Sequence, residues 1–181
     1  MHDDDDGFYV LPPPSTERPT LLNSCARAAT AAEAAFRVPY PNALRRDSRV
    51  IALDRGAAQQ ISAISEVPWQ GTHFLILAPV QPALGANKVD LSDENGTALD
   101  WSAELVGADV VVMVATTDEG AKAATVIGEM ARSRGVMTAG IVLADAKDAD
   151  EVMRSLRMSA SVLVMASDAD YLPAMLSALR A

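Results

Sequence analysis

The stretch "VVVMVATTDEGAKAATVIGEMARSRGVMTAGIVL" (residues 110–143) decides the fold class. A β-branched apolar run is followed by a short polar loop, an alanine-rich segment with apolar residues at helical spacing, and a second apolar run. Gly135 stands where the end of a helix commonly needs a residue in the left-handed conformation. The stretch therefore predicts a strand, a helix and a second parallel strand, the repeating unit of α/β proteins.

The same alternation continues on both sides of this stretch. The predicted strands are 49–54, 73–78, 108–115, 136–144 and 161–167, and the predicted helices are 56–65, 98–106, 119–135, 148–156 and 169–180. Such alternation predicts a doubly wound, Rossmann-like α/β fold, with a mostly parallel sheet of about five strands between helices. We expect strand order 2-1-3-4-5, with strands 49–54 and 108–115 adjacent and central.

Two segments precede the alternating part. Residues 1–19 combine an acidic run with several prolines, which predicts a flexible tail. Inside it, "FYVL" (8–11) is either a short docking motif or a segment that folds back onto the domain, and both interpretations stay open. Residues 20–37 are rich in alanine and contain neither Gly nor Pro, which predicts a lead-in helix. We therefore expect a single α/β domain over 20–181.

Composition excludes several classes of function. The net charge of −9 argues against a nucleic-acid backbone binder, which needs a basic face. No apolar run approaches membrane-spanning length and no secretory signal is visible, so we expect a soluble, cytoplasmic protein. The two histidines are His2 in the tail and His73 at a strand start, so no nucleophile triad is expected. The dense carboxylate run "DDDD" (3–6) lacks a fixed geometry, so we expect neither a metal site nor a catalytic residue.

Acidic side chains follow the ends of several predicted strands. They are Asp54, Asp118, Asp145 and Asp168. Ligands of α/β folds bind at this rim, where a ring of acids would suit a cation or an amine. The alternative, which we favour, is that each acid caps a following helix.

Four segments, in order, resemble the nucleotide-binding domain of the FtsZ/tubulin superfamily. "RVIALDRGAAQQISAI" (49–64) resembles the family's opening strand and glycine loop, VIGVGGGGxNAVNRM. "THFLILAPVQPAL" (72–84) is similar to EFIAVNTDAQAL, and "SVLVMASDADYL" (161–172) to DTLIVIPNDRLL. Residues 107–143 resemble the segment that carries the family's GGGTGTG signature. The resemblance covers about 120 residues and implies the GTPase-domain fold.

The resemblance also implies which positions would contact a nucleotide. In this sequence they are Asp54, Gly56, Ala57, Thr116, Thr117, Gly120, Lys122, Ser167 and Asp168. Glycine is needed in such loops so that backbone N–H groups can approach phosphate.

The departures from the family pattern fall on these loops. "DRGA" (54–57) replaces the glycine run, and "TTDEGAK" (116–122) keeps one glycine of the signature loop. Ala78 and Val80 replace the Asn and Asp of the family's turn, and Ser167 replaces the Asn that reads the base. The resemblance therefore implies a degenerate site, at which we expect neither GTP nor Mg²⁺.

The sequence leaves two main hypotheses for function. The first is an FtsZ-like protein with a degenerate nucleotide site that acts as a non-catalytic binding or assembly module, through a protein partner or self-association. The second is a divergent nucleotide or small-ligand binder that uses the carboxyl-end rim of the sheet. An enzyme of another α/β class is disfavoured by the shortage of candidate nucleophiles and bases.

Overall fold

A computed structural model describes residues 28–29, 45–79, 89–143, 149–167 and 170–179. The strands are β1 (Ala28–Ala29), β2 (Ser48–Ala52), β3 (Thr72–Leu77), β4 (Asp90–Ser92), β5 (Ala98–Asp100), β6 (Val110–Ala115), β7 (Met137–Val142) and β8 (Val162–Ala166). The helices are α3 (Arg55–Ser65), α4 (Trp101–Glu104), the 3₁₀ turn η1 (Asp118–Gly120), α5 (Ala121–Ser133), α6 (Asp150–Ser159) and α7 (Tyr171–Leu179). The tail 1–19, with its "FYVL" segment, lies outside the described residues.

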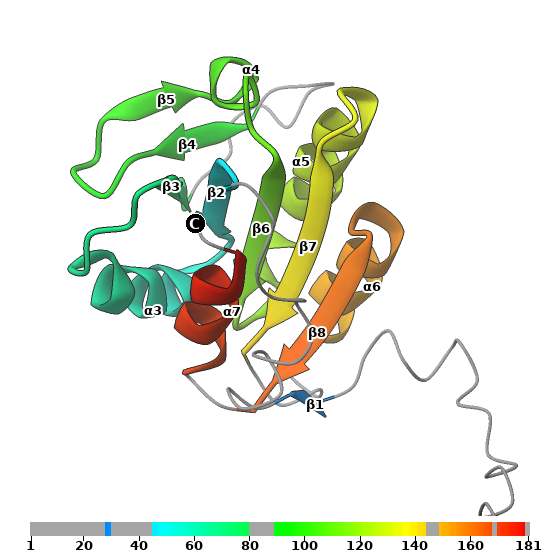
Figure 1. The fold of residues 1–181 in the computed structure, drawn as a ribbon. Coiled ribbons are helices and arrows are strands. Elements are labelled where there is room, and N and C mark those ends of the chain that lie inside the picture. The colour runs from blue at the N-terminus through cyan, green and yellow to red at the C-terminus, as the bar shows by residue number, and fades with distance from the viewer. Residues whose placement is uncertain (1–27, 30–44, 80–88, 144–148, 168–169, 180–181) are drawn as a thin grey trace, which may run out of the picture.

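The strands form one mixed sheet in the order β1-β8-β7-β6-β2-β3-β4-β5 (Figure 1). The strands expected from the sequence lie in the expected order, and the central pair β2 and β6 is parallel. The expectation of about five strands is wrong, because β1, β4 and β5 extend the sheet at its two ends. Strands β4 and β5 pair in the antiparallel sense, which makes the sheet mixed.

A hairpin replaces the first part of the helix that was expected over 98–106. The carboxylate of Asp93 accepts hydrogen bonds from the N–H groups of Asn95 (2.9 Å) and Thr97 (2.7 Å). Gly96 adopts φ +82°, which a side chain would resist. These bonds, led by the Thr97 N–H, lower the pKa of Asp93 below its ordinary value. The turn thus directs 98–100 back along β4, and the helix begins only at Trp101.

The prediction of a lead-in helix over 20–37 is wrong at Ala28 and Ala29. These two residues form β1, which pairs in parallel with Met165 and Ala166 of β8. Without β1, the outer edge of β8 would present unpaired N–H and C=O groups, and pairing them outweighs the helix preference of two alanines. The rest of 20–37 lies outside the described residues.

Helices cover both faces of the sheet (Figure 1). Alternate residues of β2 point to opposite faces. Val50 and Ala52 join the apolar cluster that includes α3 and α7, whereas Ile51 joins the cluster that includes α5 and α6. Burial on both faces explains why the central strands are continuously apolar. Among the described residues, no helix is long and apolar enough to cross a membrane.

Candidate functional site

The centre of the candidate site is the carboxylate of Asp54, which lies two residues after β2, directly before α3, and is 7% exposed. Its Oδ1 accepts hydrogen bonds from the Ala57 N–H (2.8 Å) and the Thr116 hydroxyl (2.6 Å). Its Oδ2 accepts from the N–H groups of Thr116 (2.6 Å) and Thr117 (2.9 Å). Asp54 therefore caps α3 and also ties the loop after β2 to the loop after β6.

This arrangement places an anion of the protein itself where a bound anion would lie. The N-terminus of a helix and the neighbouring loop amides attract negative charge. Here the amides of Ala57, Thr116 and Thr117 already donate to Asp54. A phosphate would have to displace a carboxylate that is covalently part of the chain and carries charge of the same sign.

Two side chains of the loop after β6, Thr117 and Asp118, also accept hydrogen bonds from N–H groups at helix starts. The Thr117 hydroxyl accepts from the Glu119 N–H (3.4 Å) at the start of η1. The carboxylate of Asp118 accepts from the Val152 N–H (2.8 Å) in the first turn of α6. The prediction that each acid caps the helix that follows it is confirmed for Asp54. It is wrong for Asp118, whose carboxylate bonds the first turn of α6 instead. Asp145 and Asp168 lie outside the described residues.

Gly56 and Gly120, which lie in these two loops, allow close packing. A Cβ at Gly56 would collide with the hydroxyl oxygen of Thr116, the same hydroxyl that bonds Asp54. A Cβ at Gly120 would stand 2.5 Å from both the Cβ and the carbonyl oxygen of Leu53. The close approach of the chain to itself is thus a sufficient reason for glycine at both positions.

Replacing Gly120 with alanine is expected to lower the free energy of unfolding by about 1–3 kcal/mol, because the methyl group would press on backbone atoms of Leu53. Urea unfolding followed by circular dichroism measures the change. The control is Lys122→Ala, an exposed position in the same segment, for which we expect a change within ~0.5 kcal/mol. Equal stability of the two variants would contradict the packing role of Gly120.

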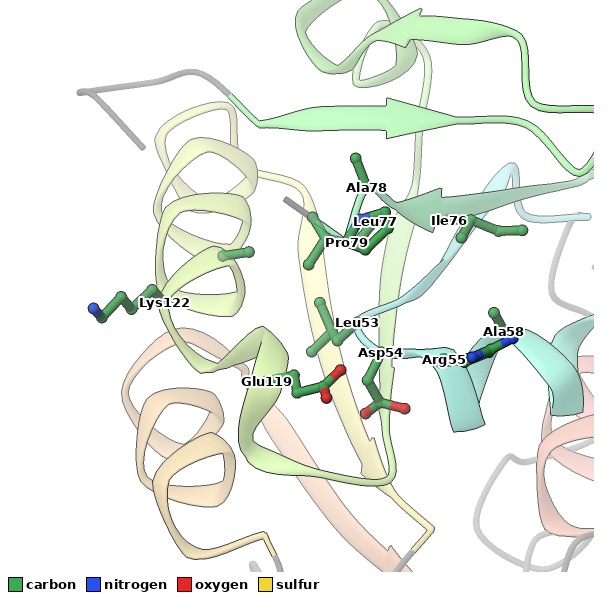
Figure 2. Close-up of a pocket in the computed structure, with 11 residues that line it drawn as sticks. Leu53, Asp54, Arg55, Ala58, Ile76, Leu77, Ala78, Pro79, Glu119 and Lys122 are labelled. Atoms are coloured by element: carbon green, nitrogen blue, oxygen red, sulfur yellow. The ribbon is translucent and has the colours of Figure 1, made fainter. Parts of the chain in front are cut away.

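A cavity of about 600 Å³ opens beside Asp54, at the ends of β2 and β3 and the starts of α3 and α5 (Figure 2). Its lining residues are Leu53, Asp54, Arg55, Ala58, Ile76, Leu77, Ala78, Pro79, Glu119, Lys122 and Ala123. Most of the wall is apolar. The charged lining residues are two acids, Asp54 and Glu119, and two bases, Arg55 and Lys122. The loops after β2, β3 and β6 thus meet at one cavity, and they are three of the segments that the family resemblance assigns to a nucleotide.

The structure brings together only part of the predicted site. Asp54, Gly56, Ala57, Thr116, Thr117 and Gly120 lie in the two loops that Asp54 joins. Lys122 is exposed, and its amino group points away from the other lining residues (Figure 2). Ser167 is exposed after β8, which is separated from β6 by β7.

Sequence reasoning missed the apolar walls of the cavity. From the sequence, these apolar residues are indistinguishable from the interior residues of strands and helices. Only their position at the ends of these elements indicates a cavity wall, and they are Leu53, Ile76, Leu77 and Ala123.

Within the described ranges, no group of three or more His, Cys, Asp or Glu side chains is placed to hold a metal ion.

Comparisons with protein families and with curated proteins identify no relative of this chain, so the proposed function rests on the geometry of the site. No family model matches the chain, and no curated protein matches it.

Proposed function

We propose that this chain is a Rossmann-like domain of FtsZ/tubulin type whose nucleotide site is degenerate, and that it works as a non-catalytic binding or assembly module. The observation that carries the proposal is the buried carboxylate of Asp54, which accepts the hydrogen bonds of both loops. The parallel pairing of β2 with β3 and β6 supports the proposed fold type. The meeting of three family-like loops at one cavity supports the proposed ancestry.

The chemistry of the loops argues for binding without turnover. Phosphoryl transfer depends on donors and metal ions that stabilise the charge of the transferring group. At this rim the loop amides bond to Asp54, and Glu119 adds a second carboxylate at the cavity margin. Lys122 supplies a cation, but its amino group points away from the other lining residues (Figure 2). The proposal therefore assigns no catalytic residue.

Isothermal titration with GTP and Mg²⁺ tests this proposal. We expect no saturable heat at nucleotide concentrations up to about 1 mM, which corresponds to a binding free energy weaker than about −4 kcal/mol. Titration with ATP and Mg²⁺ controls for a change of base preference. A micromolar Kd for either nucleotide would contradict the degenerate-site proposal.

A second candidate function is the binding of a small, mostly apolar ligand, and the cavity beside Asp54 favours it. Its volume of about 600 Å³ falls within the range of ligand sites. A ligand at one hundred times its Kd adds about 2.7 kcal/mol of stability, so thermal melting against a panel of uncharged metabolites detects it. Ala58→Leu, which narrows the cavity from α3, should abolish any such shift. A shift that survives in Ala58→Leu would place the ligand elsewhere.

A further inference from the structure

The large apolar side chains that stay well exposed in the described part of the chain lie at one end of the sheet. Each lies at the first residue of a parallel strand or shortly before one, at the opposite end from the loops that Asp54 joins. They are Val67, Val106, Met137, Met158 and Val162. Exposed apolar side chains that gather on one surface commonly mark a site of interaction. This end of the sheet is therefore a candidate docking surface.

Three of these side chains lie where β7 and β8 begin side by side (Figure 1). Val162 pairs with Ala139, two residues after Met137, so Met137 and Val162 point to the same face of the sheet. They are 48% and 50% exposed. Met158 lies near the end of α6, which covers the other face, and is 71% exposed. Met137, Met158 and Val162 thus form an apolar surface around the end of the sheet, the β7–β8 patch.

Arginine side chains flank the β7–β8 patch. The Nη1 atom of Arg46 lies 4.0 Å from the sulfur of Met137. Arg132, in the last turn of α5, donates a hydrogen bond to the carbonyl oxygen of Met158. Arg157 precedes Met158 in the last turn of α6 and is exposed. The contacts of Arg46 and Arg132 lead to uncharged atoms, so these contacts leave the positive charge of both side chains unneutralised.

Positive charge dominates this part of an otherwise acidic chain. The stretches 130–144 and 152–167, which include β7 and β8, contain four arginines and no Asp or Glu, although the chain carries a net charge of −9. Asp47 and Asp109 lie just before β2 and β6, and the Asp109 carboxylate accepts a hydrogen bond from the Asp47 N–H (2.9 Å). Glu129 is an exposed acid on α5. The four arginines outnumber these three acids, so the local field favours a negatively charged partner.

From these features we propose that the β7–β8 patch docks an acidic segment of another protein, in which Asp or Glu residues flank an apolar side chain. The apolar side chain packs on Met137 and Val162, and methionine adapts readily to the shape of a partner. The flanking carboxylates pair with Arg46 and Arg132, because a planar guanidinium group suits a carboxylate. An apolar centre with a polar rim, enriched in Met and Arg, is the usual composition of a protein interface.

This inference rests on the proposed function in taking the chain to be a binding module, and it adds the surface and the chemistry of the partner. The β7–β8 patch lies at the opposite end of the strands from Asp54. The nucleotide titration and the peptide experiment below therefore fail independently. A null peptide result leaves the degenerate loops as they are, and a micromolar nucleotide Kd leaves the patch as it is.

Fluorescence anisotropy of a labelled peptide, Glu-Glu-Leu-Leu-Glu-Glu, with the full chain tests the proposal. We expect saturable binding that weakens as salt is added, because salt screens ion pairs at a surface. A peptide with Lys in place of Glu should not bind, and one with Ser in place of Leu should bind about fivefold more weakly. Equal binding of the three peptides would overturn the proposal. So would binding of the chain to phosphatidylserine vesicles but not to the acidic peptide.

Two neighbouring arginines provide a matched pair of variants. Arg46→Gln removes the charge beside Met137 and should weaken binding of the acidic peptide about tenfold. Arg45 directs its guanidinium to Gln70 instead, so Arg45→Gln makes the same change in net charge and should stay within about twofold of the wild type. Equal losses in the two variants would show that net charge alone attracts the peptide, and would overturn the proposal.

Two exposed valines test the apolar part in the same way. Val162→Thr keeps the β-branched shape at the start of β8 and should weaken binding about threefold. Val67→Thr makes the same change before β3, outside the β7–β8 patch, and should bind as the wild type does. Melting followed by circular dichroism verifies that the variants fold. Wild-type affinity in both Arg46→Gln and Val162→Thr would also overturn the proposal.

Discussion

Replacing Asp54 with alanine is expected to lower the free energy of unfolding by about 4 kcal/mol. The substitution removes the acceptor of three N–H groups and one hydroxyl at a position that is 7% exposed. Each buried donor left without a partner costs about 1–3 kcal/mol, and water entering from the neighbouring cavity offsets part of the sum. The loops after β2 and β6 should also lose their connection.

Urea unfolding of Asp54→Ala and Asp118→Ala separates this effect from ordinary capping. The Asp118 carboxylate accepts a hydrogen bond from the Val152 N–H, and the loss of this bond should cost about 1 kcal/mol. Hydrogen exchange at Thr116 and Thr117 should accelerate in Asp54→Ala and stay unchanged in Asp118→Ala. If the two variants lose equal stability, Asp54 acts only as a helix cap and does not stabilise the connection between the loops after β2 and β6.

Replacing Glu104 with alanine is expected to cost about 3 kcal/mol of stability. Arg49 on β2 is 6% exposed, and its Nε lies 3.0 Å from the Glu104 carboxylate and 2.8 Å from the Glu104 carbonyl oxygen. The same carboxylate lies 3.0 Å from Nδ1 of His73. Removing it leaves a buried guanidinium with carbonyl acceptors only, and an uncompensated buried charge is strongly destabilising.

A double-mutant cycle isolates the charge effect in this prediction. Arg49→Met keeps much of the apolar stem while removing the charge, so Arg49→Met/Glu104→Ala should recover most of the loss seen in Glu104→Ala. Chemical unfolding of the four proteins gives the coupling free energy. Additive losses would show that Glu104 stabilises the protein without regard to Arg49.

The central part of the fold was predictable from sequence because its signals are local and strong. The β-branched run of β6 and the helical spacing of α5 each specify their own element. Strands β1 and β5 were not predictable. Each is only two or three residues long, and each depends on hydrogen bonds to a neighbouring strand rather than on its own composition. Tertiary pairing of this kind overrides local propensity.

The candidate site was predictable in its location but not in its chemistry. The position of Asp54 after a strand and before a helix indicates a rim residue and a cap. The sequence does not reveal that the same carboxylate also bonds Thr116 and Thr117, more than sixty residues later. That contact depends on the parallel register of β2 and β6, which sets the two loops side by side.

The most direct test of the central claim is an NMR titration of the labelled protein with GTP and Mg²⁺. The claim is that Asp54 holds the amides that a phosphate would need. It predicts that the amide signals of Ala57, Thr116 and Thr117 keep their chemical shifts throughout the titration, because these N–H groups remain bonded to the carboxylate. Saturable shifts at these three amides would show that phosphate displaces Asp54, and would contradict the account.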